Sequence, residues 1–210
     1  MKAPRKTRVA LVVRLMAVHD NVAPVSKIEV EVKLRLTDAA TFQARLLQAG
    51  ARLLHPREFE DNLVYDFPDR TLTQRGALLR VRLIERQAVL TFKDRARFDS
   101  GAKVREEVES TLPRPEAESL IAILGKIGLA PIFRYQKYRT TWSSEGLLIT
   151  LDETPIGDFI ELEGNKGLID RMAEHLGHGP QDFITASYRD LYLQSLEERS
   201  GPLDQMVFTS

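Results

Sequence analysis

The sequence contains no cysteine and has a formal net charge of zero, because 30 Lys and Arg residues balance 30 Asp and Glu residues. Without cysteine there is no disulfide, no thiolate metal ligand and no cysteine nucleophile. The charge balance argues against general binding to nucleic acid or to an anionic membrane. The apolar run "VALVVRLMAV" is interrupted by Arg14 and is too short to span a membrane. These absences are typical of a cytoplasmic protein whose strong electrostatics are local.

The chain has 210 residues, of which 43% are hydrophobic, and this is enough for one large domain or two small ones. We expect residues 1–26, which are basic and then apolar, to form a loosely ordered N-terminal extension. Residues 27–197 are expected to form the folded domain. Residues 198–210 are expected to be a peripheral C-terminal tail.

Alternation between apolar and charged residues predicts eight strands. In chain order, they cover residues 28–34, 59–67, 77–83, 88–93, 103–111, 133–142, 146–153 and 158–164. Helices are predicted after the first and fifth strands, and two more near the C-terminus. These helices cover about 38–50, 115–128, 165–177 and 182–196. Residues 68–76 and 94–102 are predicted to be loops.

The predicted elements repeat once along the chain. Glu29-x-Glu31 recurs 78 positions later as Glu107-x-Glu109, and each pair is followed by a helix. After a shorter second connection the offset becomes 70. The matched residues are then Gly76 and Gly146, Arg80 and Thr150, Arg82 and Asp152, Thr91 and Glu161, and Lys93 and Glu163. The chain therefore resembles two copies of a strand–helix–strand–strand–strand unit.

One face of nearly every predicted strand is ionised, and the other face is aliphatic. In "IEVEVKL", for example, Glu29, Glu31 and Lys33 alternate with Ile, Val and Leu residues. An open antiparallel sheet with water on one face would explain the alternation, but not the scarcity of Ser, Gln and Asn at the charged positions. We therefore favour a closed barrel with a charged lumen. It would contain seven acids and seven bases: Glu29, Glu31, Glu107, Glu109, Asp152, Glu161 and Glu163, and Lys33, Arg80, Arg82, Lys93, Arg105, Lys137 and Arg139.

The repeat also sorts these charges, because the first half supplies bases where the second half supplies acids. We therefore expect an acidic wall facing a basic wall. Two carboxylates ~4 Å apart repel by about 4 kcal/mol at an effective dielectric of about 20, so Mg²⁺ or Mn²⁺ would relieve the acidic wall. For the same reason, removal of Glu29 or Glu31 should leave the stability of the metal-free protein unchanged or higher. The basic wall suits a polyanion, and a metal-bridged triphosphate would satisfy both walls.

The segment "IEVEVKL" resembles the ExExK signature of the CYTH family, the triphosphate tunnel metalloenzymes. This family includes class IV adenylyl cyclases, thiamine triphosphatases and inorganic triphosphatases. The segments "ALLRVRL", "LTFK", "REEVES", "RYQKYRTTW" and "LDETPIGDFIELEG" follow in the family's order, so the resemblance covers about residues 27–196. It implies an α+β fold in which helices pack outside an eight-stranded antiparallel tunnel that binds a triphosphate and a divalent metal.

The resemblance also implies roles for individual residues. The metal side would comprise Glu29, Glu31, Asp152, Glu161 and Glu163. The phosphate side would comprise Lys33, Arg80, Arg82, Lys93, Arg105, Lys137 and Arg139. The residues expected to be catalytic are Glu29, Glu31, Lys33, Arg80 and Arg82. Glu107 and Glu109 would either pair with the bases or hold a second metal, and Lys93 and Arg105 have the alternative of being ordinary ion-pair partners.

Two reactions begin from the same bound triphosphate. A cyclase joins the ribose 3′-hydroxyl to the α-phosphorus and releases pyrophosphate, whereas a triphosphatase directs water to the terminal phosphorus. "LDETPIGDFIELEG" and "SYRDLY" resemble the class IV adenylyl cyclase-like branch, whose members can also be triphosphatases. ATP, tripolyphosphate and thiamine triphosphate are the candidate substrates. A non-catalytic binder of nucleotide or polyphosphate is the alternative of another class, and a homodimer is left open.

Overall fold

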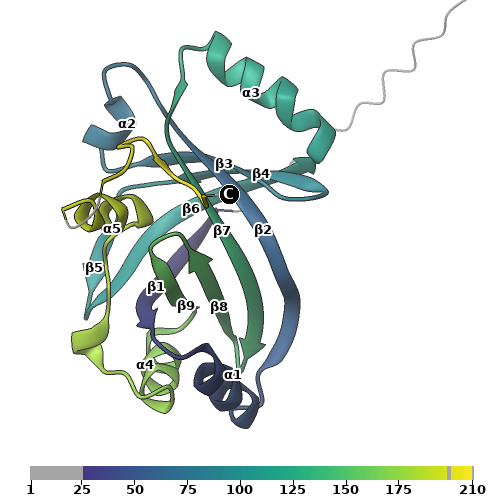
Figure 1. The fold of residues 1–210 in the computed structure, drawn as a ribbon. Helices are drawn as coiled ribbons and strands as arrows, with labels where there is room; N and C mark the ends of the chain where they lie inside the picture. The colour runs from purple at the N-terminus through teal and green to yellow at the C-terminus, as the bar shows by residue number, and fades with distance from the viewer. Residues whose placement is uncertain (1–25, 198–199, 210) are drawn as a thin grey trace, which may run out of the picture.

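The computed structural model describes residues 26–197 and 200–209. Its eight main strands are β1 Ser26–Leu36, β2 Arg52–Asp66, β3 Leu78–Leu83, β4 Gln87–Lys93, β6 Ala102–Pro113, β7 Ala130–Ser144, β8 Leu147–Thr154 and β9 Gly157–Glu163. They form an antiparallel ring in the order β1–β9–β8–β7–β2–β3–β4–β6, and pairing of β1 with β6 closes it (Figure 1). The predicted fold of eight antiparallel strands arranged in a ring, with helices outside, is confirmed.

The internal repeat is visible in this ring. The strand order is unchanged when β1, β2, β3 and β4 are exchanged with β6, β7, β8 and β9. Each half contributes strands that pair with the other half, at β1–β6, β1–β9, β4–β6 and β2–β7. Gly50 and Gly128, which are also 78 positions apart, follow the equivalent helices of the two halves with φ of 67° and 94°. Both positions need a left-handed backbone that glycine adopts without strain.

Helices α1 (Ala39–Gln48) and α4 (Lys166–His175) cover the outer face of β1, β8 and β9. Asp38 begins α1 by accepting hydrogen bonds from the N–H groups of Ala40 and Thr41. Phe42 and Leu46 from this helix pack with the outward aliphatic residues of the strands in one buried cluster. Figure 1 shows α1 and α4 together at one end of the molecule. The aliphatic faces predicted from the alternation therefore form a core outside the ring.

Helices α2 (Thr71–Gln74) and α3 (Ala117–Lys126) contribute Leu72 and Leu124 to a second cluster with Val81 of β3. The prediction of a loop over residues 68–76 is wrong at α2. The buried Asp66 carboxylate, at the end of β2, accepts hydrogen bonds from the N–H groups of Leu72 and Thr73 at the start of this helix, and this cap compensates for a weak helical pattern.

Two other predicted boundaries differ from the structure. β2 begins at Arg52, well before the predicted residue 59, because residues 52–58 pair with β7 through register shifts that break the alternation. The predicted loop 94–102 contains a short strand, β5 (Arg97–Asp99), which pairs with β6. In both places the pairing was missed because the local sequence lacks a period of two.

The C-terminal segment packs against the barrel. Helix α5 (Tyr188–Ser195) and strand β10 (Gln205–Met206) form a third buried cluster with Phe133 of β7 and Phe159 of β9. Met206 is 1% exposed, so the prediction of a peripheral tail is wrong at this residue. The predicted N-terminal extension, apart from Ser26, lies outside the described residues. No helix in the described part of the chain is both long enough and apolar enough to cross a membrane.

Candidate functional site

The inward faces of the strands enclose a cavity of about 400 Å³. Because side chains alternate across a strand, the charged residues singled out in the sequence share this inner face. Every predicted site residue except Asp152 lines the cavity. Asp152 is fully buried beside it and contacts two of the lining bases, Lys137 and Arg139. The structure thus brings all of the predicted site residues into one place.

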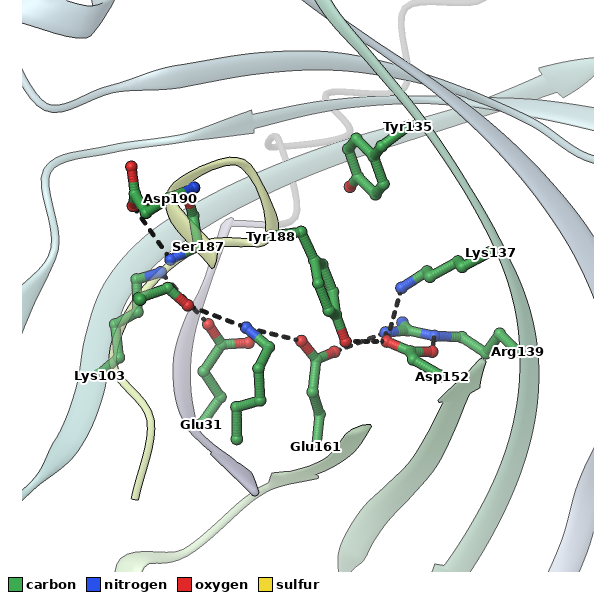
Figure 2. A network of polar contacts seen from close by, with 12 residues as sticks. Glu31, Lys103, Tyr135, Lys137, Arg139, Asp152, Glu161, Ser187, Tyr188 and Asp190 are labelled. Atoms are coloured by element: carbon green, nitrogen blue, oxygen red, sulfur yellow. Dashed lines mark hydrogen bonds and ion pairs between the residues drawn. The ribbon is translucent and has the colours of Figure 1, made fainter. Parts of the chain in front are cut away.

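Asp152 is the centre of the most tightly paired group (Figure 2). Its carboxylate accepts hydrogen bonds from Lys137 Nζ at 2.8 Å, from Arg139 Nε and Nη2 at 2.6 Å each, and from the Tyr188 hydroxyl at 2.6 Å. Arg139 Nη2 also lies 2.5 Å from Glu161 Oε2. Burial opposes charge on Arg139, but these carboxylates hold its pKa well above the usual value. The carboxylates of β8 and β9, Asp152 and Glu161, are therefore already neutralised by bases.

Glu29 forms a similar group on β1. It is 4% exposed and accepts hydrogen bonds from Lys93 Nζ at 2.6 and 2.9 Å and from Arg105 Nε at 3.0 Å. Burial raises the pKa of Glu29, but Lys93 and Arg105 together lower it to about 2. Removal of Glu29 would leave two buried bases without this partner. The structure therefore predicts a loss of stability for this variant, in contrast to the expectation from the sequence.

Glu107 and Glu109 of β6 lie among the same bases. Glu107 is 3.1 Å from Lys93 Nζ, and Glu109 accepts a hydrogen bond from the Thr91 hydroxyl at 2.7 Å. Burial, together with the nearby Glu29 and Glu109 carboxylates, raises the pKa of Glu107. Pairing with bases, one of the two roles left open for these residues, is the arrangement seen here.

The signs of charge are sorted on some strands only. We call β8 and β9 the acidic hairpin, because their inward side chains include the acids Asp152, Glu161 and Glu163. We call β3 and β4 the basic hairpin, because their inward side chains include the bases Arg80, Arg82 and Lys93. β1 and β6 carry both signs. Arg105 of β6 contacts Glu29 of β1, although the repeat matched these two strands through their acids, Glu29-x-Glu31 and Glu107-x-Glu109. The prediction of two separate walls is wrong on these two strands.

Arg80 and Arg82 have fewer partners than the acids. Arg80 donates to the Tyr135 hydroxyl at 3.1 Å and to Thr91 Oγ1 at 3.2 Å, whereas the nearest carboxylate oxygen to Arg82 is Glu60 Oε1 at 3.5 Å. The Nε atoms of Arg80 and Arg82 are buried and have no hydrogen-bond partner. Burial and the nearby Arg80 guanidinium lower the pKa of Arg82. Unsatisfied buried donors are costly, so this part of the cavity is suited to an anionic ligand.

Two further residues of the site were missed or underused in the sequence. Glu60 of β2 is 4% exposed and lies among the bases of β3 and β7. Glu60 lies in the predicted strand 59–67 and shares its inward face with Asn62, but Asp61 interrupts the apolar face opposite and weakens the alternation. The Tyr188 ring lies 4.3 Å from Lys33 Nζ and 5.2 Å from Lys137 Nζ, measured to the ring centroid. Tyr188 belongs to "SYRDLY", which was noted only as a family motif.

The positions of the cavity carboxylates decide whether they could hold a divalent metal ion. Among the described residues, no three Asp, Glu or His side chains converge on one point. Glu31 and Glu163 do lie directly opposite each other on β1 and β9. The ion pairs of Glu31 are long, at 3.5 and 3.6 Å, whereas Glu163 accepts a hydrogen bond of 2.9 Å from the half-exposed Lys27. Mg²⁺ is commonly held by one or two carboxylates together with substrate phosphates and water. The donor set therefore fits a metal that binds with a phosphorylated ligand.

One side of the cavity is apolar. Val64, Ala77, Leu78, Ile132 and Phe133 line it next to the charged residues. These side chains come from β2, β3, β7 and the approach to β3, close to α2. A ligand that fills the whole cavity would therefore need an anionic part and an apolar part.

Comparison with known proteins agrees with this geometry. Residues 27–188 match the model of the CYTH domain. No curated protein sequence matches the chain. A Pyrococcus horikoshii protein of known structure is 24% identical, with a TM-score of 0.68, over 80% of this chain and 99% of its own. A candidate adenylate cyclase from Vibrio parahaemolyticus is 22% identical, with a TM-score of 0.66, over 80% of this chain and 98% of its own.

A third solved structure is a candidate adenylyl cyclase from Hippeastrum that is described as having a dominant triphosphatase activity. It is 20% identical to this chain, with a TM-score of 0.61, and the match covers 84% of this chain and 99% of that protein. At these identities, the likeness to the three solved structures supports the fold alone.

Proposed function

This chain belongs to the CYTH domain family, and from that premise we propose that it is a divalent-metal-dependent enzyme that acts on a small-molecule triphosphate. The observation that carries the proposal is the pair of unpartnered Nε donors of Arg80 and Arg82 in a buried cavity. Phosphate oxygens would satisfy these donors with charge-assisted hydrogen bonds. A neutral ligand would not compensate the excess of positive charge around β3.

The spacing of the two arginines suits a chain of phosphoryl groups. Arg80 and Arg82 lie on the same face of β3 and are separated by two residues, which corresponds to about 7 Å along the strand. Each can therefore contact a different phosphoryl group of one ligand. Lys137 and Arg139 on β7 supply further positive charge from another side of the cavity. A monophosphate would engage only part of this set.

We infer that Mg²⁺ or Mn²⁺ binds together with the substrate, at Glu31 and Glu163. The metal would polarise a phosphoryl oxygen and neutralise charge that develops on the leaving group. Glu29, Asp152 and Glu161 were predicted to be metal ligands, and in the arrangement described here they hold Lys93, Lys137, Arg105 and Arg139 in place. Their short ion pairs keep these bases oriented toward the cavity before the substrate binds.

Cyclisation of ATP to cyclic AMP and pyrophosphate is the reaction that we favour, in keeping with the class IV cyclase-like motifs. The apolar side of the cavity supports a substrate with an organic group, because inorganic tripolyphosphate would leave Leu78 and Ile132 in contact with water. Hydrolysis of a nucleoside or thiamine triphosphate uses the same phosphate and metal contacts, and it is the alternative. Binding without turnover is the alternative of another class.

The test is to incubate the protein with ATP, thiamine triphosphate or tripolyphosphate in the presence of Mg²⁺ or Mn²⁺ and to identify the products by ³¹P NMR and chromatography. Cyclic AMP with pyrophosphate would establish the cyclase. Orthophosphate with the corresponding diphosphate would establish a triphosphatase. Binding of all three compounds without product would identify a non-catalytic binder, and failure to bind any of them would refute the proposed function.

A further inference from the structure

Glu60 is a buried carboxylate that contacts bases without hydrogen-bonding to them. Its Oε1 lies 3.5 Å from Arg82 Nη1 and 4.0 Å from Arg139 Nε, and its Oε2 lies 3.5 Å from Lys137 Nζ. Glu60 Oε2 has no hydrogen-bond partner. Asp152, in contrast, contacts Lys137 and Arg139 at 2.6 to 2.8 Å. The same two bases are thus held closely by one carboxylate and loosely by the other.

This loose contact has an electrostatic consequence. Glu60 stays ionised because Lys137, Arg82, Arg139 and Arg80 lower its pKa far enough to outweigh the effect of burial. Its negative charge therefore offsets part of the positive charge of the basic residues. Glu60 makes no hydrogen bond to Arg82, and the Nε donor of Arg82 has no partner, so it remains free for a ligand. A phosphate bound at Arg82 would lie close to Glu60 and would be repelled by it.

We propose that Glu60 is an internal counter-ion that limits how tightly the tunnel holds polyphosphates, including the polyphosphate product. In the empty tunnel, Glu60 offsets the mutual repulsion of the bases. When a polyphosphate is bound, Glu60 weakens its attraction to the same bases and so favours release. This inference rests on the proposed binding of triphosphate, and it assigns Glu60 an affinity-setting role rather than contact with the reacting atoms.

The direction of the effect separates this role from a structural one. If Glu60 only kept Arg82, Lys137 and Arg139 in position, its neutral replacement would disorder them and weaken binding. If Glu60 limits affinity, the neutral replacement strengthens binding, because the bases lose a competing anion. Tighter binding that affects substrate and product equally lowers KM, and it slows turnover when product release limits the rate.

The experiment compares Glu60→Gln with the wild type by calorimetric titration of tripolyphosphate and pyrophosphate at fixed ionic strength without metal. We expect about tenfold tighter binding of both ligands, which corresponds to about 1.4 kcal/mol. KM and kcat for the substrate that is turned over should both fall. Asp61→Asn is the matched control, because Asp61 is the next residue on β2 and pairs with Arg134 through hydrogen bonds of 2.6 and 2.9 Å. Its affinities should equal those of the wild type.

Glu60→Asp provides a second variant in case Glu60→Gln does not fold. Aspartate keeps the negative charge, but its side chain is one methylene shorter, so the charge lies farther from the bases. Its affinity for tripolyphosphate and pyrophosphate should therefore lie between that of the wild type and that of Glu60→Gln. Weaker or unchanged binding in whichever variant folds would overturn the inference while leaving triphosphate binding established. If the wild type does not bind tripolyphosphate or pyrophosphate, the inference and the proposed function fail together.

Discussion

The basic hairpin β3–β4 and the acidic hairpin β8–β9 occupy equivalent places in the two halves of the barrel. They differ in how well their charges are paired. In the acidic hairpin, Asp152 and Glu161 make ion pairs of 2.5 to 2.8 Å with Lys137 and Arg139. In the basic hairpin, Arg80 and Arg82 each retain a buried Nε without a partner. The same scaffold therefore holds one hairpin whose carboxylates Asp152 and Glu161 are paired and one whose two arginines lack partners at Nε.

This difference separates stability from ligand binding within one cavity. Buried charges with good partners are costly to disrupt, whereas buried donors without partners gain when a ligand arrives. The acidic hairpin should therefore contribute mainly to stability and to the orientation of the bases. The basic hairpin should contribute mainly to affinity for phosphate. Substitutions in the two hairpins ought to move different observables.

The largest expected effect is on stability, in Asp152→Ala. This change leaves Lys137, Arg139 and Tyr188 without their shared acceptor, so the free energy of unfolding should fall by about 3–5 kcal/mol. Urea denaturation of the metal-free protein would measure it. Arg82→Ala is the comparison from the basic hairpin and should lose much less stability. A similar loss in both variants would contradict the division of roles.

Glu31→Gln should affect catalysis more than stability. The ion pairs of Glu31 with Lys103 and Arg105 are long, at 3.6 and 3.5 Å, so the free protein should remain folded. Loss of a metal ligand should lower metal-dependent kcat/KM by about 100-fold, equivalent to about 3 kcal/mol. Steady-state kinetics with Mn²⁺ and with EDTA would test this. Full turnover in EDTA, or full activity of the variant, would show that Glu31 holds no catalytic metal.

Arg80→Ala and Arg82→Ala should each weaken tripolyphosphate binding by about 10- to 100-fold, because each removes a charge-assisted contact of about 1.5–3 kcal/mol. Binding of ATP should weaken comparably and binding of AMP much less. Calorimetric titration of the three ligands would measure the losses. Arg134→Ala, which removes a half-exposed arginine paired with Asp61, is the control and should change none of them.

Two other outcomes of that titration would be informative. An equal loss for tripolyphosphate, ATP and AMP would mean that the two arginines act only as a general positive field. No loss for any ligand would mean that they interact only with lumen carboxylates, and the basic hairpin would then have no role in binding.

The smallest expected effect is a pH dependence at Asp66, which anchors α2 at the entrance to the basic hairpin. Burial raises its pKa, but hydrogen bonds from Thr73 and from the N–H groups of Leu72 and Phe67 lower it below its ordinary value. An acid with a lowered pKa stabilises the fold above its unfolded pKa of about 3.9, and this contribution is lost as the pH falls through the lower folded value.

Asp66→Asn should therefore reduce the loss of Tm between about pH 4 and pH 2.5, and it should cost about 1–2 kcal/mol of stability at pH 7. Thermal denaturation of both proteins across this range would measure the difference. The acidic hairpin has no equivalent helix, because β7 and β8 are joined by the short turn at Glu145 and Gly146. An identical pH profile in wild type and variant would exclude a role for the Asp66 carboxylate.

The sequence predicted the inward charges because strands with a period of two place them all on one face. That logic worked for "IEVEVKL" and for Arg80 and Arg82, where Ile, Val and Leu mark the opposite face. It missed Glu60, because the neighbouring Asp61 places a charge on the opposite face and so interrupts the alternation at this end of the predicted strand. It also missed α2, whose first N–H groups are capped by Asp66 from the end of β2, and the buried Met206, which pairs with the distant Tyr135 of β7.

The pairing of charges was harder to foresee than their location. Arg105 was assigned to bind phosphate, but Glu29 lies opposite it in the register of β1 and β6 and accepts its Nε–H. Such contacts depend on how the ring closes, and the alternation within single strands does not encode this. For the same reason, the sequence could place seven acids in the lumen without showing which of them are neutralised.

We propose above all that Arg80 and Arg82, whose buried Nε atoms lack partners, make this cavity a receptor for linked phosphoryl groups. Titration of tripolyphosphate and then of orthophosphate into the metal-free wild-type protein, at low and high salt, tests it most directly. We predict one binding site for tripolyphosphate, weaker binding as salt increases, and an affinity for orthophosphate at least about 100-fold lower, because orthophosphate cannot bridge both arginines. Equal affinities for the two anions, or no binding of tripolyphosphate, would contradict the account.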